Sequence, residues 1–142
     1  MKALARDQSI CVLATITGRQ PYCSLMAYVT NRKCSEIYMV THKQTQKYKN
    51  LIENPAVSIL IDNRDPSPRS TTLAMTIEGV FQKIIDLSKD KKVRQKLLSA
   101  HPHLTEFIRH PEAEVFQIRI RSFLLLNGLT QASFEDVSDS VY

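Results

Sequence analysis

Alternating apolar and polar positions recur along most of the 142-residue chain and predict a protein built mainly of β-strands. Short polar or Gly/Pro-containing turns separate the first three strands and predict that each pairs back on the one before it. An internal glycine, Gly79, interrupts the long strand expected at 72–85 and predicts a β-bulge or a close backbone approach. The six expected strands cover residues 11–17, 22–30, 36–40, 56–62, 72–85 and 113–126.

Helical spacing occurs in only two of the connections. Thr45 is a plausible N-cap for a short helix whose apolar face is Tyr48, Leu51 and Ile52. Ser88 is expected to cap a second helix that ends near residue 99, and a third helix is expected at 104–109. A parallel sheet would need a crossover helix between nearly every pair of strands, so the pattern favours a mainly antiparallel β-barrel with short helices.

Composition is that of one globular domain, with 43% hydrophobic and 23% charged residues. We expect this domain to cover residues 1–130 and the acidic tail 131–142 to be mobile or to lie across a partner. No apolar run is long enough to span a membrane, and the first residues lack a signal-peptide core. Three cysteines without Cys-x-x-Cys spacing argue against disulfides and zinc, which favours a cytoplasmic location, and each is expected to be a small buried residue.

A candidate anion site lies where the third strand gives way to the first helix. Thr41 and Thr45 offer hydroxyls, Lys47 offers an ammonium group, and the helix N-terminus offers free backbone N–H groups. This arrangement suits a phosphate, although the Gly-rich Walker sequence is missing. The structural alternative is a capped surface helix that carries lysines for solubility.

Residues matching one known pattern occur in order from 12 to about 129. The most specific set is Thr41, Thr45, Lys47 and the Asn54-Pro55 pair that closes the helix. With these residues in place, the chain resembles the FMN-binding split-barrel family related to pyridoxamine 5′-phosphate oxidase. The matching stretches are 12–15, 18–21, 24–28, 38–41, 45–51, 54–58, 61–64, Gly79 and 101–104.

The resemblance implies a six-stranded antiparallel split β-barrel that forms a homodimer, with FMN in a groove at the subunit interface. It assigns the phosphate contacts to Thr41, Thr45, Gln46 and Lys47, and the strand beside the isoalloxazine ring to Ser24, Leu25, Met26 and Ala27. It also places Asn63 and Arg64 near the flavin. The structural alternatives are an inward strand hydroxyl for Ser24, core packing for Met26 and a surface ion pair for Arg64.

Two departures separate the chain from the oxidase itself. The last strand lacks the Arg-x-His element that grips pyridoxal phosphate, and Cys23 and Ser24 stand where the oxidase has an arginine. Oxidation of pyridoxamine 5′-phosphate is therefore not expected. No general acid or base stands out: His101 and His103 are interpreted as structural, and His42 as a solvent-exposed or phosphate-steering residue.

Three function hypotheses follow. The first is an FMN-binding, flavin-dependent oxidoreductase acting on a small redox substrate. The second is a binding protein without turnover for FMN, FAD, a deazaflavin or haem, and it would use the same site residues. The third is a basic nucleic-acid binder, which the net charge of +5 permits but the scattered aromatic residues do not favour.

Overall fold

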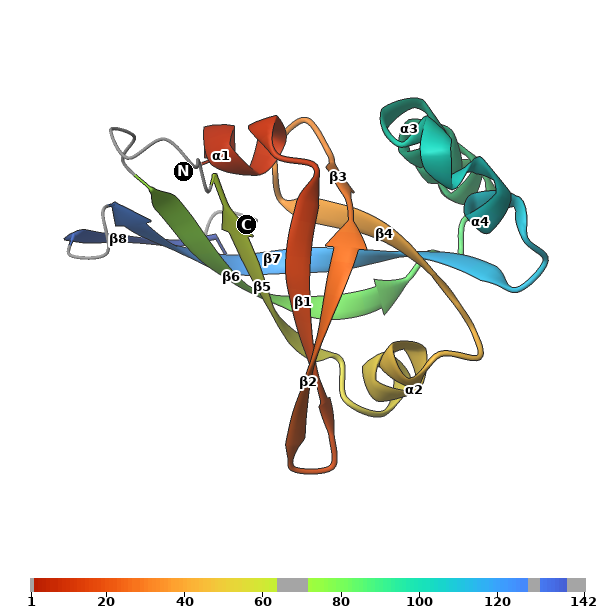
Figure 1. Cartoon of the computed structure of the whole chain (residues 1–142), viewed down its shortest axis with the longest axis horizontal. Helices are drawn as coiled ribbons and strands as arrows, with labels where there is room; N and C mark the ends of the chain where they lie inside the picture. The colour runs from red at the N-terminus through yellow and green to blue at the C-terminus, as the bar shows by residue number, and fades with distance from the viewer. Residues whose placement is uncertain (1, 64–71, 128–130, 138–142) are drawn as a thin grey trace.

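The strands of the protein form one curled antiparallel sheet, seen in a computed structural model that describes residues 2–63, 72–127 and 131–137. The sheet follows the order β2-β1-β5-β6-β7-β4-β3, and β8 also pairs with β7 (Figure 1). This confirms the mainly β, antiparallel split-barrel prediction. The strands are β1 (Ile10–Thr17), β2 (Gln20–Ala27), β3 (Val29–Thr30), β4 (Glu36–His42), β5 (Ala56–Asp62), β6 (Leu73–Lys83), β7 (Ala113–Asn127) and β8 (Gln131–Asp136).

Period-two alternation places the core inside the curl of the sheet. In β1, for example, Cys11, Leu13 and Thr15 are buried while the residues between them are half-buried. The structure confirms both expectations at Gly79, a β-bulge and a close backbone approach. The β6–β7 register shifts between Glu78 and Gly79, and a Cβ atom at Gly79 would lie 2.5 Å from Ile118 Cγ2 and 2.8 Å from the Arg119 carbonyl oxygen.

Helices close the two ends of the curled sheet and cover part of its outer face (Figure 1). Leu51 of α2 and Leu4 of α1 join the main core. A second cluster, which includes Val93, Leu97 and Tyr38, packs α3 and α4 against β4 and β7. The helices are α1 (Lys2–Asp7), α2 (Gln46–Glu53), α3 (Leu87–Ala100), the 3₁₀ turn η1 (Pro102–Leu104) and α4 (Thr105–Arg109).

The prediction of six strands is wrong by two, because the described residues form eight. The strand expected at 22–30 divides at Tyr28, whose N–H donates to the Ser9 carbonyl and whose hydroxyl donates to the Ala5 carbonyl at 2.6 Å. Before this anchor the chain pairs with β1, and after it the chain pairs with β4. The second addition is β8, which lies within the segment expected to be an acidic tail.

The structure confirms the two helices predicted after residue 85, which are α3 and α4, with one change at the N-terminus of α3. The N-cap of α3 is Asp86 rather than Ser88, because the Asp86 carboxylate accepts from the Ser88 N–H at 2.8 Å. None of the helices in the described part of the chain has the length and apolar content needed to cross a membrane.

Candidate functional site

The junction between β4 and α2 is held by a short chain of hydroxyl hydrogen bonds. Thr45 is the N-cap of α2, as predicted: its Oγ1 accepts from the Tyr48 N–H at 3.3 Å and donates to the His42 carbonyl at 2.9 Å. Thr41 is fully buried, and its Oγ1 lies 3.1 Å from Thr45 Oγ1. These contacts fix the N-terminal turn of α2, from which Lys47 projects.

A hollow of about 340 Å³ lies beside this junction. Leu25, Met26 and Ala27 of β2 line it together with Lys47 of α2, so four of the predicted site residues meet although two separate segments supply them. The remaining lining residues are Ile10, Val40, His101, His103, Leu104 and Phe107. The hollow is therefore largely apolar, with one ammonium group at its wall.

The Lys47 ammonium is available for a ligand. Among the described residues it has no ion-pair or hydrogen-bond partner, whereas Lys43 lies 3.8 Å from a carboxylate oxygen of Glu114. The Lys47 side chain is only half-exposed, and it stands within the first turn of a helix, where anions are favoured. A phosphate beside Lys47 would find both a charge and backbone donors.

Of the other predicted site residues that the structure describes, none lines this hollow, Thr41 and Thr45 included. Ser24 is half-buried next to it, and the Gln46 amide donates instead to Asn50 Oδ1 at 2.8 Å. Asn63 follows the far end of β5 from α2, where its Oδ1 accepts from the Leu73 N–H at 2.7 Å. Arg64 lies outside the described residues.

Asn50 fixes the position of α2 relative to the sheet. Its fully buried side chain accepts from Thr17 Oγ1 at 2.6 Å and donates to Thr15 Oγ1 at 3.1 Å. With the bond from Gln46, one amide satisfies three polar groups and ties the helix to β1. The orientation of Lys47 toward the hollow depends on this anchor.

The histidines divide into packed residues and one open residue. His101 is buried with Nε2 3.0 Å from the Tyr28 carbonyl oxygen, which confirms a structural role. His42 is half-exposed and stacks on Phe107 with ring centroids 3.9 Å apart, so one face of its ring is packed, and its phosphate-steering role stays a prediction. His103 lines the hollow and makes no hydrogen bond with the described residues.

Sequence reasoning assigned His103 to structure and did not find Phe107. Both residues could have been found from the 101–104 stretch and the short helix that follows it. This segment packs beside β2 and β4, and its side chains therefore reach the hollow. Lys47 lies far from both residues in the sequence, so no local pattern indicated that all three line one hollow.

The two buried thiols, Cys11 and Cys34, are not candidates for redox chemistry. Burial raises the pKa of Cys11 to about 12 and also raises the pKa of Cys34, so both thiols stay protonated. Cys23 differs from the expectation of burial and is exposed on β2. Within the described ranges, no three His, Cys, Asp or Glu side chains gather closely enough to hold a metal ion.

Comparison with solved structures shows the same fold in proteins of low sequence identity. A haem-binding protein from Mycobacterium smegmatis superposes with a TM-score of 0.82 at 17% identity over 96% of this chain, which spans 57% of that protein. An FAD-binding protein from Mesorhizobium loti gives 0.74 at 20% identity over 92% of this chain and 90% of that one. HutZ, the haem storage protein from Vibrio cholerae, gives 0.71 at 16% identity over 84% and 86%.

Comparison with curated proteins finds no match. The family model described as pyridoxamine 5′-phosphate oxidase matches residues 1–127, which is nearly the whole chain and includes both Lys47 and the β2 wall of the hollow. The protein belongs to the pyridoxamine 5′-phosphate oxidase-related family of split barrels.

Proposed function

We propose that the protein binds FMN as a homodimer and acts as a flavin-dependent oxidoreductase on a small substrate other than pyridoxamine 5′-phosphate. One observation supports this above the others: Lys47 and the Leu25–Ala27 stretch of β2 line one hollow. A flavin mononucleotide has an anionic phosphate at one end and a flat apolar ring system at the other. The hollow offers both an ammonium group and apolar walls.

The residues present fit the phosphate end of this cofactor through Lys47 and the N-terminal N–H groups of α2, and the buried Thr41 hydroxyl, 3.1 Å from Thr45 Oγ1, would support that turn. Thr45 is already engaged as the N-cap, so its contribution is to orient the turn and to polarise the donors around it. Leu25, Met26 and Ala27 would provide the side of the hollow that excludes water from the ring.

A bound flavin supplies hydride and electron transfer, and the protein determines where that chemistry occurs. Lys47 would hold the charged end in place, which leaves the ring to be positioned by the apolar wall. His103 stands at the same hollow with an uncommitted imidazole, from which it could hold or release a proton near a substrate. FAD and a deazaflavin are alternative ligands for the same hollow.

Flavin binding is tested by titrating the purified protein with FMN and following the quenching of FMN fluorescence. Saturation at one FMN per chain, followed by mass analysis of the released cofactor, supports the proposal and separates FMN from FAD. Oxidation of a reduced nicotinamide by the loaded protein would then show turnover. Absence of saturable flavin binding at micromolar protein would contradict the proposal.

The loaded protein is expected not to oxidise pyridoxamine 5′-phosphate at a useful rate. A dianionic substrate needs fixed cationic or amide donors opposite the flavin, and β7 supplies Arg119 and Arg121 without the histidine of the Arg-x-His element. Arg121 is exposed on the outer face of the sheet, away from the hollow. Formation of pyridoxal 5′-phosphate at about one turnover per second or faster would show the expectation to be wrong.

A second candidate is haem binding, which His103 favours as an uncommitted imidazole beside an apolar hollow. Two structures with this fold are a haem-binding and a haem storage protein. Titration with haem distinguishes the candidates. If haem is the ligand, His103→Ala should weaken haem binding and shift its absorbance, and it should leave the affinity for FMN unchanged.

A further inference from the structure

Another hollow, of about 620 Å³, lies between α1, β3 and α3. β3 contacts both helices, and Figure 1 shows α1 and α3 on either side of it. This α1–α3 hollow shares no lining residue with the hollow beside Lys47. Most of its lining side chains are polar, and they include Arg6, Asp7, Ser9, Gln95, Lys96 and Ser99. A hollow lined in this way suits a polar ligand, in contrast to the largely apolar hollow beside Lys47.

Two hydrogen bonds hold the walls of the α1–α3 hollow against its floor. The Tyr28 hydroxyl donates to the Ala5 carbonyl at 2.6 Å and joins α1 to the start of β3. The Lys96 ammonium donates to the Thr30 carbonyl at 3.0 Å and joins α3 to the end of β3. Both walls are therefore tied to β3 before a ligand arrives, which lowers the entropic cost of binding.

Each helical wall of the hollow presents one cationic side chain. Arg6 on α1 is exposed, and its guanidinium makes no ion pair or hydrogen bond with any residue that the structure describes. Lys96 on α3 uses one of its three N–H groups for Thr30, so two remain for a ligand. An anion in the hollow would therefore lie between cations from two different helices.

Further positive charge lies near α1 and the β3–β4 turn. Burial raises the pKa of the Cys34 thiol in this turn, and the positive charges of Arg6 and Lys2 act against that rise. The two basic residues of the turn, Arg32 and Lys33, are exposed and form no ion pair with the described residues. An anion that approaches this side of the molecule is therefore attracted.

Asp7 is the acidic side chain among the described residues that line the hollow. Its carboxylate has no hydrogen-bond or ion-pair partner in the described part of the chain, and an ionised carboxylate only accepts hydrogen bonds. It would repel a phosphate but accept from hydroxyl groups. Ser9, Ser99 and Gln95 add groups that both donate and accept. The lining thus favours a ligand with an anionic group in one part and hydroxyl groups in another.

We propose that the α1–α3 hollow binds a sugar phosphate, either free or as part of a nucleotide, with its phosphate between Arg6 and Lys96 and its sugar hydroxyls toward Asp7. A phosphate monoester carries a charge of about −1.5 to −2 at pH 7, which matches the two cationic side chains. A volume of about 620 Å³ lies within the range of small-molecule sites. This site needs neither flavin nor Lys47 and lies beyond the proposed function.

Isothermal titration calorimetry of the purified, flavin-free protein with ribose 5-phosphate tests this site. We expect saturable binding of one ligand per chain, with a dissociation constant of about 1 mM or lower, and no binding of ribose. Arg6→Gln and Lys96→Gln should each raise the dissociation constant about tenfold or more, because each removes a charge-assisted hydrogen bond. AMP in place of ribose 5-phosphate distinguishes the two sources: tighter binding of AMP identifies a nucleotide, and tighter binding of ribose 5-phosphate identifies a free sugar phosphate.

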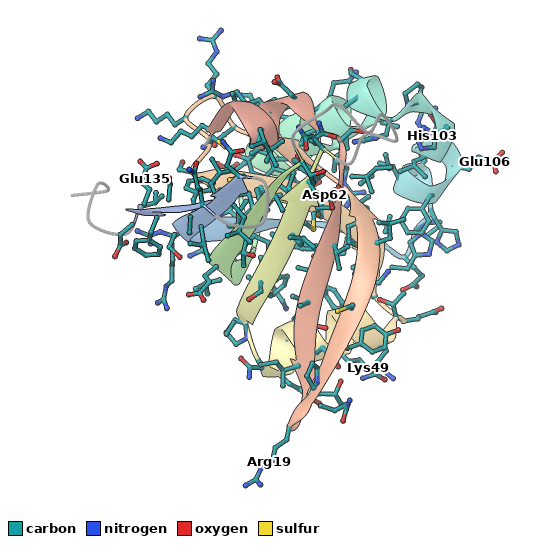
Figure 2. The ribbon with its side chains drawn as sticks, turned by 60° about the vertical axis from the view of Figure 1, so that its left-hand side comes forward. Arg19, Lys49, Asp62, His103, Glu106 and Glu135 are labelled. Atoms are coloured by element: carbon teal, nitrogen blue, oxygen red, sulfur yellow. The ribbon has the colours of Figure 1, made fainter. Side chains whose placement is uncertain are left out.

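Lys92→Gln and Arg19→Gln are the matched controls and should leave the dissociation constant unchanged. Lys92 is exposed on α3 but does not line the hollow, and Arg19 lies at the tip of the β1–β2 hairpin, at the opposite end of the molecule from α1 (Figure 2). Circular dichroism with a thermal scan shows whether each variant is folded. Asp7→Ala should reduce the preference for ribose 5-phosphate over inorganic phosphate, since it removes both an acceptor for hydroxyl groups and a repulsion of phosphate.

Absence of saturable binding of ribose 5-phosphate and AMP at millimolar concentration, or full affinity in a folded Arg6→Gln variant, would overturn the site. An unchanged preference in Asp7→Ala would overturn the placement of the sugar. Lys47→Ala keeps the result separate from the flavin proposal: it should bind ribose 5-phosphate as the unchanged protein does, and Arg6→Gln should bind FMN as the unchanged protein does. Loss of ribose 5-phosphate binding in Lys47→Ala would place the phosphate at α2, which supports the Lys47 site and contradicts the α1–α3 site.

Discussion

Replacing Lys47 by alanine is expected to weaken FMN binding about ten- to a hundredfold, which corresponds to about 1.5–3 kcal/mol. The ammonium group faces the hollow, has no partner among the described residues and lies in the first turn of α2. A hydrogen bond between two charged groups is roughly twice as strong as a neutral one. The dissociation constant from fluorescence quenching measures the loss.

Lys49→Ala is the matched control, because Lys49 lies on the same helix and is exposed, and it should leave the affinity almost unchanged. Thr41→Ala and Thr45→Ala should each cost less than Lys47→Ala, about 0.5–1.5 kcal/mol, since each removes a neutral hydrogen bond that holds the first turn of α2 in place. Equal affinities for the Lys47 variant and the unchanged protein would rule out a phosphate at α2.

Asn50→Ala is expected to lower the free energy of unfolding by about 2–4 kcal/mol. The change deletes three buried or part-buried hydrogen bonds: the side chain of Asn50 accepts two, from Thr17 and Gln46, and donates one to Thr15. The Thr15 hydroxyl is then left with only a 3.5 Å contact to the Tyr22 carbonyl oxygen. It also frees α2 from β1, so FMN affinity should fall although Asn50 lies outside the hollow. Urea unfolding and FMN titration measure the two effects.

Asn54→Ala is the control for Asn50→Ala, because Asn54 is the C-cap of the same helix. Asn54 Oδ1 accepts one exposed hydrogen bond from the Ala56 N–H at 3.1 Å, and its loss should cost about 1 kcal/mol or less. If both variants lost the same stability, Asn50 would not be the anchor of α2, and the link between that anchor and the site would fail.

The sequence was most informative where a local pattern determines local structure. Alternation located the main strands, Thr45 located the start of α2, and Gly79 located the bulge, because each depends on neighbours along the chain. The same holds for Lys47, which could be recognised from its place in the first helical turn. Leu25, Met26 and Ala27 came instead from the family resemblance.

Contacts that depend on distant partners could not be predicted in the same way. β8 has no buried alternation, and it forms because β7 extends beyond β4 and leaves an edge free. The division of β2 from β3 depends on Tyr28 reaching Ala5 and Ser9, which local propensity does not report. His103 and Phe107 meet Lys47 only through the packing of η1 and α4.

The pairing of β7 has a consequence for the order in which the protein can fold during synthesis. Apart from the two-residue β3, the only strand partner of β4 within the described ranges is β7, which begins at Ala113. The ribosome will therefore have released most of the chain before β4 gains a stable neighbour, and closing so long a loop slows folding. Thr41, near the end of β4, then becomes fixed late, and a nascent chain truncated before residue 113 would not hold the candidate phosphate site in place.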